Sequence, residues 1–444
     1  METLNRLQSG QLKGTKRLDL AAGLTQFPPE IFELADSLEI LNLSNNQFKS
    51  LPDEFASLQQ LKIVFLSNNE FEELPTVLSQ CPKLSMIGFK ANRITTIAEA
   101  ALPPSIRWLI LTDNQIERLP ASMGHLKQLQ KLMLAGNQLR SLPATMVACQ
   151  NLELIRLSAN QLDALPDWLL TLPRLSWLAY SGNPFCDQVA GEPRSLACID
   201  WANLTFKETL GEGASGIISK AIWRNPQTQQ ELDVAVKVFK GHVTSDGLPM
   251  DEMQTCIAAG SHPNLVKLLG KLINHPEQKS GLIFDCIPLA YKNLGNPPSL
   301  ESCTRDTYPP NTTFSFPVTL RISQNIAAVA AHLHANKLLH GDLYAHNILI
   351  DDTGESLLSD FGAASFYPGD NPSLHRSLES LEVRAFGCLL EDLLEHLDPS
   401  SADAKWDSNS CDRLHQLQQD CMNPLSSARP LFAEIWETLG KLYS

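Results

Sequence analysis

One segment of about 23 residues recurs through the first 183 residues and constrains the fold more than any other feature. The copies LEILNLSNNQFKSLP, LKIVFLSNNEFEELP, IRWLILTDNQIERLP, LQKLMLAGNQLRSLP and LELIRLSANQLDALP follow one another in register. Their shared asparagine falls at Asn46, Asn69, Asn92, Asn114, Asn137, Asn160 and Asn183, and Gly23 holds the same place in a degenerate first copy. A period of this length indicates a solenoid in which each repeat packs against its neighbours.

The spacing within each copy matches L-x-x-L-x-L-x-x-N-x-L, the leucine-rich repeat pattern. Its L-x-L part predicts a short parallel strand whose leucines, such as Leu41 and Leu43, point into the core. The sharp turn that follows leaves backbone groups outside the ladder, so we expect the asparagine column to satisfy them with hydrogen bonds. We therefore predict an α/β leucine-rich repeat solenoid over residues 1–192. It would have about eight repeats, with caps in residues 1–14 and roughly 184–200.

Alternate strand residues of such a solenoid line its concave face. The side chains predicted there are Phe65, Trp108, Ile110, Met133, Arg156 and Trp177. Exposed aromatic, methionine and arginine side chains are typical of protein contacts, so we expect a protein substrate or regulator to bind this face. The alternative is that these side chains fill gaps or face a flanking domain.

The charge and the cysteines exclude several classes of function. Residues 201–444 hold 18 basic and 29 acidic residues, which argues against binding to nucleic acid or an anionic membrane. No apolar run of about 18 residues predicts a membrane-spanning helix. The start, METLNRLQSGQLKG, lacks the features of a signal peptide. Ten scattered cysteines without a C-x-x-C pair predict reduced thiols and a cytoplasmic location.

The repeat ends near Asn183, and a different pattern begins after a predicted linker at residues 193–203. The segment LTFKETLGEGASGIISKAIW places Gly211, Gly213 and Gly216 in G-x-G-x-x-G spacing. Strand-like runs on both sides predict a hairpin over phosphate groups, whereas a dinucleotide fold needs a helix directly after the glycines. Glycine allows backbone N–H groups to approach phosphate oxygens closely.

A lysine follows this hairpin at the end of an apolar strand. Lys237 lies in LDVAVKVFK, 21 residues beyond Gly216, and its position after V-A-V is typical of a lysine that contacts phosphate. A helix predicted from MDEMQTCIAAG follows. Glu252 is the best candidate for an ion pair with Lys237, and Asp251 is the nearest rival.

The second half of the chain, from Thr205 to Ser444, resembles a eukaryotic-type protein kinase domain. The matching segments are LGEGASG, VAVK, HPNLVKLLG, HGDLYAHNIL, SDFG, EVRAFGCLLEDLL and ARPLFAEIWETL, in the expected order. The whole chain resembles a leucine-rich repeat protein kinase without a membrane segment. The resemblance implies an α+β two-lobed kinase fold over residues 204–444, with ATP and Mg²⁺ as cofactors and a protein hydroxyl as phosphate acceptor.

The resemblance also implies a role for each matching residue. Lys237 would hold the α- and β-phosphates and pair with Glu252, and Asp342 would accept the proton of the attacking hydroxyl. Asn347 and Asp360 would hold magnesium. Phe284 would guard the back of the adenine pocket. The ATP-binding set implied by the resemblance is Leu210, Gly211, Glu212, Gly213, Ala214, Ser215, Gly216, Ile218, Lys237, Asp285 and Ile287.

Three departures from the kinase pattern leave alternatives open. Gly341 replaces the arginine that often pairs with a phosphorylated activation loop. Serine/threonine kinases usually carry lysine two positions after the catalytic aspartate, and tyrosine kinases carry arginine two or four positions after it. Here these two positions hold Tyr344 and His346, although a protonated His346 could partly substitute for the missing basic residue. The segment after Asp360 is short and lacks A-P-E, with Glu379 as the nearest possible partner of Arg429. A serine/threonine protein kinase is favoured. A pseudokinase scaffold is the first alternative, and a small-molecule kinase is a less favoured one.

Overall fold

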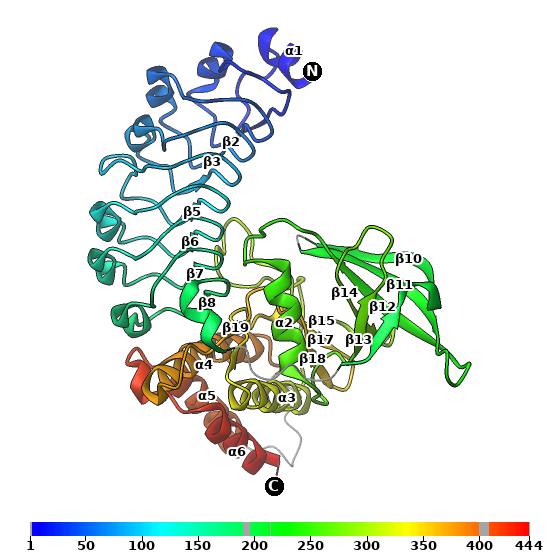
Figure 1. Ribbon diagram of the computed structural model, residues 1–444. Helices are drawn as coiled ribbons and strands as arrows, with labels where there is room; N and C mark the ends of the chain where they lie inside the picture. The colour runs from blue at the N-terminus through cyan, green and yellow to red at the C-terminus, as the bar shows by residue number, and fades with distance from the viewer. Residues whose placement is uncertain (1, 190–195, 214, 399–407, 444) are drawn as a thin grey trace. The chain divides into compact units, whose positions relative to one another are not determined.

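The computed structural model describes residues 2–189, 196–213, 215–398 and 408–443 (Figure 1). Its contacts separate two compact units, Met1–Leu175 and Ser176–Ser444. This split lies before the strand of the eighth repeat, whereas the boundary predicted from the sequence follows residue 192.

The first unit is a solenoid of parallel strands that pair in sequence order, each 22 or 23 residues after the last. The strands are β1 (Arg17–Asp19), β2 (Ile40–Asn42), β3 (Ile63–Phe65), β4 (Met86–Gly88), β5 (Trp108–Ile110), β6 (Lys131–Met133) and β7 (Leu154–Arg156). The central residue of every strand is buried. Helix α1 (Glu2–Gln8) precedes them within the predicted cap.

Short 3-10 helices carry the chain from one strand to the next. They are η1 (Pro29–Leu34), η2 (Asp53–Ser57), η3 (Thr76–Gln80), η4 (Ala121–His125), η5 (Ala144–Ala148) and η6 (Asp167–Thr171). Each begins directly after a proline in extended conformation, the proline of the L-P pair that closes most repeats. Figure 1 shows these turns along one side of the solenoid and the strands along the other.

The asparagine column satisfies buried backbone groups, as the repeat spacing predicted. The Asn137 side-chain nitrogen donates to the carbonyls of Leu111 and Leu134, both at 2.9 Å. Its oxygen accepts from the Ile116 N–H at 3.1 Å. Asn69, Asn92, Asn114 and Asn160 repeat this arrangement. These asparagines are therefore structural.

The predicted partner-binding side chains differ in exposure. Phe65, Trp108 and Ile110 are partly exposed, and the Lys131 amine lies 4.2 Å from the centre of the Trp108 ring. Met133 and Trp177, which we predicted to be exposed, are 8% and 1% exposed, and Arg156 is also buried. The prediction is therefore wrong for Met133, Arg156 and Trp177. Trp177 is buried because it packs against the second unit's own loop, described below.

The second unit contains a mixed sheet with the strand order β10-β11-β12-β14-β13-β9. Its strands are β9 (Cys198–Asp200), β10 (Leu204–Glu212), β11 (Gly216–Arg224), β12 (Glu231–Phe239), β13 (Leu268–Ile273) and β14 (Gly281–Asp285). Helix α2 (Pro249–Ala259) lies between β12 and β13 in the chain. Before this sheet come β8 (Trp177–Ala179), from the eighth repeat, and η7 (Pro184–Val189).

Part of the predicted linker belongs to this sheet. Residues 198–203 form β9 and the 3-10 helix η8 (Trp201–Asn203), and β9 pairs in parallel with β13. The physical reason is burial, because Ile199 packs in one apolar cluster with Val234 and Leu272. An isolated apolar residue in a short segment carries no periodic signal, so the strand was not predicted.

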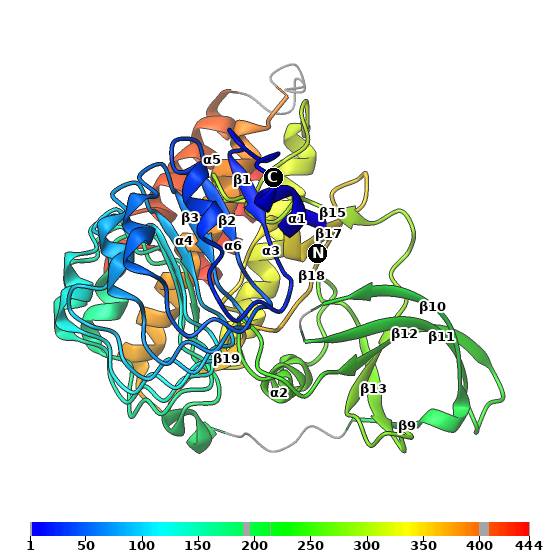
Figure 2. The ribbon, with the colours of Figure 1, turned by 90° about the horizontal axis from the view of Figure 1, so that it is seen from above.

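The remaining residues build a helical lobe. Its helices are α3 (Phe316–Ala335), α4 (Pro372–Glu395), α5 (Ser408–Cys421) and α6 (Phe432–Tyr443), with η9 (Ala345–Asn347) and η11 (Ser426–Ala428) as 3-10 turns. Its short strands are β15 (Lys292–Asn293), β16 (Leu338–Leu339), β17 (Ile348–Ile350), β18 (Ser356–Leu358) and β19 (Ser365–Phe366). Figure 2 shows strands β10–β13 grouped apart from α3 and α6, which confirms the predicted two-lobed α+β architecture.

Helix α4 begins earlier than the sequence motif EVRAFG indicates. Asn371 caps it by accepting hydrogen bonds from the Ser373 and Leu374 N–H groups, and Pro372 occupies the first turn. Only residues 361–371 therefore separate Asp360 from the helix, and Glu379 lies within it. Among the helices of the described residues, none is long and apolar enough to cross a membrane.

Candidate active site

A cavity of about 350 Å³ lies in the second unit between the mixed sheet and the helical lobe. The predicted site residues that line it are Ile218, Lys237, Glu252, Phe284, Asp285, Ile287, Asn347 and Asp360. They come from β11, β12, α2, β14, the loop before β17 and the segment after β18. Folding thus brings residues 218 to 360 of the sequence to one concave site.

Lys237 and Glu252 form a largely buried ion pair across the cavity wall, with side chains 13% and 6% exposed. Burial raises the pKa of Glu252, and the charge of Asp360 adds to this, while Lys237 acts in the opposite direction. Lys237 therefore supplies the positive charge that favours an ionised Glu252. Glu252, rather than its rival Asp251, makes this pair, because neighbouring helix residues point in different directions.

The glycine segment forms the predicted hairpin, with β10 and β11 antiparallel. At its tip the Gly213 N–H donates to the Gly216 carbonyl at 3.0 Å. A Cβ on Gly216 would lie 2.7 Å from the Val238 carbonyl oxygen, so this position requires glycine. The Lys240 amine contacts Glu212 at 2.7 Å and the Gly213 carbonyl at 3.1 Å.

The cavity reaches this hairpin only at Ile218 among the predicted ATP-binding residues of the glycine segment that the structure describes. Leu210, Gly211, Glu212, Gly213, Ser215 and Gly216 are outside its lining, and Leu210 is 54% exposed. The prediction for Ala214 lies outside the described residues.

Asp342 and Asn347 are held together within the loop between β16 and β17. The Asn347 side-chain nitrogen donates to the Asp342 carboxylate at 2.8 Å and to its carbonyl at 2.9 Å. Because this nitrogen faces Asp342, the amide oxygen faces the opposite way. Asp360 adopts a left-handed backbone conformation with a φ of 57°, and its carboxylate accepts from the Gly362 N–H at 3.0 Å.

His340 is a structural residue. It is 1% exposed, its Nε2 lies 3.0 Å from the Ser359 carbonyl, and its Nδ1 accepts from the Asp342 N–H at 3.3 Å. Its ring also meets Phe361 edge-on, with centroids 5.3 Å apart. His340 therefore joins the loop of Asp342 to the segment of Asp360.

Glu382 of α4 supports the same loop and has a role that the sequence did not reveal. Its buried carboxylate accepts from the Gly341 N–H at 2.6 Å, the His340 N–H at 3.3 Å and His334 Nε2 at 2.8 Å. Burial alone would raise the pKa of Glu382, but the contacts with His334 outweigh it and lower the pKa. The only signal in the sequence was a carboxylate within an apolar helical stretch.

Asp306 is a second residue that the sequence did not reveal. It contacts His346 twice, through Nδ1 at 2.7 Å and through the backbone N–H at 3.1 Å. Burial lowers the pKa of His346, yet the hydrogen bond and charge of Asp306 outweigh this and raise it. The two residues are 40 positions apart and lie on either side of α3, so no local pattern connects them.

Arg429 ties α4 to the loop before α6. It donates to the carbonyls of Ser380 at 2.9 Å and Asn423 at 2.8 Å. The carboxylate of Glu379, its possible partner from the sequence, accepts from the Phe432 N–H at 3.0 Å.

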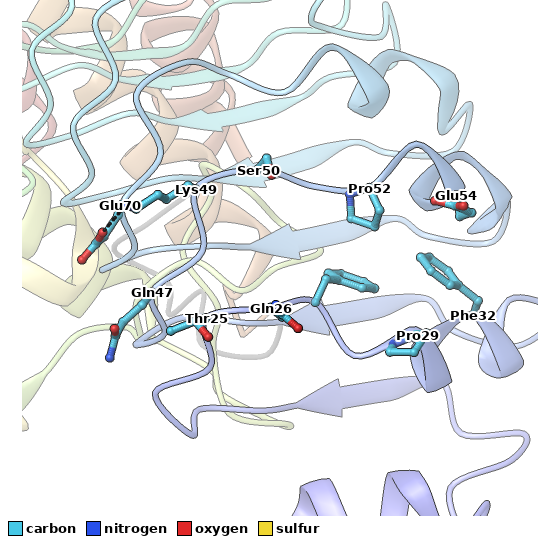
Figure 3. Close-up of a pocket in the computed structure, with 11 residues that line it drawn as sticks. Thr25, Gln26, Pro29, Phe32, Gln47, Lys49, Ser50, Pro52, Glu54 and Glu70 are labelled. Carbon is cyan, nitrogen blue, oxygen red and sulfur yellow. Dashed lines mark ion pairs between the residues drawn. The ribbon is translucent and has the colours of Figure 1, made fainter.

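The first unit holds a larger cavity, of about 890 Å³, on the loops and 3-10 turns of its first repeats (Figure 3). Phe32, Pro29 and Pro52 lie at one end, and Lys49 forms an ion pair with Glu70 at the other, at 3.7 Å. The Lys49 and Glu70 side chains are 75% and 31% exposed, whereas the Lys237–Glu252 pair is largely buried, so the smaller cavity of the second unit is the better candidate for chemistry.

Comparison with protein families agrees with this site. Residues 204–385 match the family described as protein tyrosine and serine/threonine kinase. Residues 13–71, 36–94 and 127–185 match the leucine rich repeat family. The chain therefore carries leucine-rich repeats ahead of a protein kinase domain.

Individual relatives are distant. The chain is 27% identical over 281 residues to "Probable serine/threonine-protein kinase gdt4" of Dictyostelium discoideum, covering 55% of this chain and 16% of that protein. It is 24% identical to fibroblast growth factor receptor 1 of Xenopus laevis, covering 60% and 38%. It is 27% identical to U-box domain-containing protein 33 of Arabidopsis thaliana, covering 55% and 32%. The matches thus span less than half the length of each of these relatives.

Proposed function

We propose that this chain transfers the γ-phosphate of ATP to a serine or threonine hydroxyl of a protein. The observation that carries the proposal is the shared cavity, which is lined by the Lys237–Glu252 ion pair and by Asn347 and Asp360. Asp342 is hydrogen-bonded to Asn347 beside it. These are the charges and donors that phosphoryl transfer requires, since the reaction depends on positioning and electrostatics.

Different residues of the chain would bind ATP and accept the proton. Glu252 orients the Lys237 amine, which would contact the α- and β-phosphates. Asp342 would accept the proton of the attacking hydroxyl, and Asn347 holds its carboxylate in one orientation. Phe284 would limit the depth of the adenine pocket, with Asp285 and Ile287 at its edge.

The donor set fits magnesium. Asn347 and Asp360 offer amide and carboxylate oxygens, the ligands that Mg²⁺ prefers. Among the residues that the structure describes, no group of three His, Cys, Asp or Glu could hold a metal by itself, so phosphate oxygens would complete the site. Bound magnesium would neutralise negative charge on the phosphates.

The choice of serine or threonine as the acceptor rests on a comparison. Tyr344 and His346, two and four positions after Asp342, match neither the lysine of serine/threonine kinases nor the arginine of tyrosine kinases. A relative covering more than half of the chain is named as a serine/threonine kinase.

The repeats would bring a protein partner to the kinase domain. Phe65 on β3 and Trp108 on β5 remain partly exposed in the first unit and would contribute to that contact. Cys81, Cys149 and Cys421 are buried thiols outside any disulfide, which suits a reducing compartment such as the cytoplasm.

Transfer from labelled ATP to a general protein substrate tests the proposal, with Asp342→Asn and Asp352→Asn compared. We expect Asp342→Asn to lower kcat at least 100-fold while the Kd for ATP changes less than twofold, because this residue acts on the acceptor. Asp352→Asn is the matched control, since that side chain is 89% exposed in a turn. Analysis of the labelled amino acid then separates serine and threonine from tyrosine.

Other outcomes favour the alternatives. Binding of ATP without transfer by the wild-type chain would identify a pseudokinase scaffold. Transfer to small alcohols but to no protein would identify a small-molecule kinase.

A further inference from the structure

The strand of the eighth repeat, β8, contacts the loop that carries Asp342. The Trp177 ring stacks on the Tyr344 ring, with centroids 4.3 Å apart and planes only 8° from parallel. The Trp177 indole N–H donates to the Leu343 carbonyl at 3.1 Å. One side chain of the repeat thus touches the two residues that follow Asp342.

The same repeat contacts the segment that follows Asp360. The Tyr180 N–H donates to the Ser365 hydroxyl at 3.2 Å, and its own hydroxyl donates to the Phe366 carbonyl at 3.1 Å. Ser365 and Phe366 form β19, which pairs with β16 directly before the Asp342 loop. Figure 1 shows β8 beside β19 and α4.

Gly341 lies where these contacts meet. Its φ of +73° favours glycine, and a Cβ there would lie 2.5 Å from the Leu178 carbonyl oxygen. The Ala363 carbonyl oxygen would be only 2.7 Å away. No other side chain fits at Gly341 while β8 and the segment after Asp360 keep these places. The missing arginine therefore follows from the presence of the repeat.

The segment between Asp360 and α4 offers no exposed hydroxyl for a phosphate. Residues 361–371 contain only Ser365 and Tyr367 as hydroxyl side chains. They are 0% and 2% exposed, and Tyr367 contacts His334 inside the lobe. Phosphorylation of either residue would require the segment to leave its place.

We propose that Trp177, Leu178 and Tyr180 form a built-in clamp, which takes the place of activation-loop phosphorylation by holding the Asp342 loop and residues 361–367 in one conformation. The clamp rests on the kinase activity proposed above. Trp177 and Tyr180 are its positioning residues, because they contact backbone and ring atoms next to the reacting groups.

Three variants of the full chain test the clamp. Trp177→Leu removes the stack and the hydrogen bond, and Tyr180→Phe removes the hydroxyl contact. Trp436→Leu is the matched control, because Trp436 is 51% exposed on α6. We expect Trp177→Leu to lower kcat at least tenfold and Tyr180→Phe about threefold. The KM for ATP should stay within twofold, because the Lys237–Glu252 pair is untouched.

Amide hydrogen exchange reports directly whether the clamp orders the two segments. We expect faster exchange in residues 341–345 and 365–367 of Trp177→Leu, with exchange in β10–β12 unchanged. If Trp177→Leu does not fold, Trp177→Phe keeps the aromatic stack without the indole N–H and should show an intermediate kcat. Unchanged kcat and unchanged exchange in Trp177→Phe and Tyr180→Phe would overturn the clamp.

Phosphatase treatment tests the second part of the proposal. Wild-type chain treated with a general phosphatase should keep its kcat within twofold. A tenfold loss, with a phosphate located on Ser365 or Tyr367 by mass spectrometry, would overturn the proposal that the clamp replaces phosphorylation. If the wild-type chain transfers no phosphate, the proposed function fails, while the exchange comparison still decides whether the clamp orders the loop.

Discussion

His346 shows how one neighbour changes the chemistry of a residue that is atypical in its motif. Asp306 accepts hydrogen bonds from the ring and from the backbone N–H of His346. This contact raises the pKa of His346 above the ordinary value of 6.5. The ring also lies 5.0 Å from the Tyr344 ring that Trp177 covers. The loop residues after Asp342 are therefore fixed by two partners from outside the motif.

This contact predicts a pH dependence of stability. Because the folded state raises the pKa of His346, its stabilising contribution is complete below about pH 6.5 and is lost as the pH rises through the raised value. His346→Gln should therefore lower the free energy of unfolding by about 2 kcal/mol at pH 6 and by less at pH 9. Denaturant titrations at the two pH values measure the difference.

Asp306→Asn serves as the partner variant for that experiment. It removes the negative charge that faces His346. In this background, the loss of unfolding free energy caused by His346→Gln should therefore differ less between pH 6 and pH 9. A loss in His346→Gln that is equal at both pH values, or larger at pH 9, would contradict the assignment.

Among the elements, the short repeat strands are stabilised by the hydrogen bonds of the asparagine column. Each strand of the first unit has three residues, too few to be stable without its neighbours. The asparagine of each repeat joins backbone groups of adjacent turns. A single asparagine therefore connects two repeats.

Asn137→Ala should lower the free energy of unfolding by about 3 kcal/mol, because it leaves the buried carbonyls of Leu111 and Leu134 and the Ile116 N–H without this partner. Gln138→Ala, at the exposed neighbouring position, is the control and should change it by less than about 0.5 kcal/mol. Denaturant unfolding followed by circular dichroism measures both. Equal effects of the two variants would argue against the structural role.

The elements also show where sequence patterns were insufficient. The hairpin β10–β11 was predicted because glycine spacing and strand periodicity agree over some 20 residues. Strand β9 and the early start of α4 were not predicted. The strand depends on the burial of Ile199, and the start of the helix depends on capping by Asn371. Short contacts of this kind leave no periodic signal.

At the scale of the whole molecule, the two compact units do not divide where the repeat pattern ends. The compact units separate between Leu175 and Ser176, so the second unit retains the strand of the eighth repeat. The eighth repeat continues the sequence pattern of the array, and its strand contacts the Asp342 loop.

Two deletions distinguish this division from the boundary predicted from the sequence. A chain of residues 176–444 keeps Trp177 and Tyr180 and should retain kcat on a general substrate within about threefold, whereas a chain of residues 196–444 should lose at least tenfold. Circular dichroism of both chains checks that they fold. Equal kcat in two folded chains would show that the eighth repeat is dispensable for turnover.

The sequence by itself determined the repeat architecture and the kinase domain, and it predicted the linear site residues. It could do so because Lys237, Asp342, Asn347 and Asp360 each lie in a short motif whose spacing reflects local geometry. Glu252 followed from its distance to Lys237, and the ion pair between them confirms it.

Only the tertiary structure decided what surrounds these motifs. Glu382, Asp306 and Trp177 lie 40 to 166 residues from the loop atoms that they contact. Contacts over such separations depend on how whole elements pack, which local spacing does not encode. The same reason explains Gly341, which resembled a lost arginine in the sequence and in the structure is the residue that lets β8 lie against the loop.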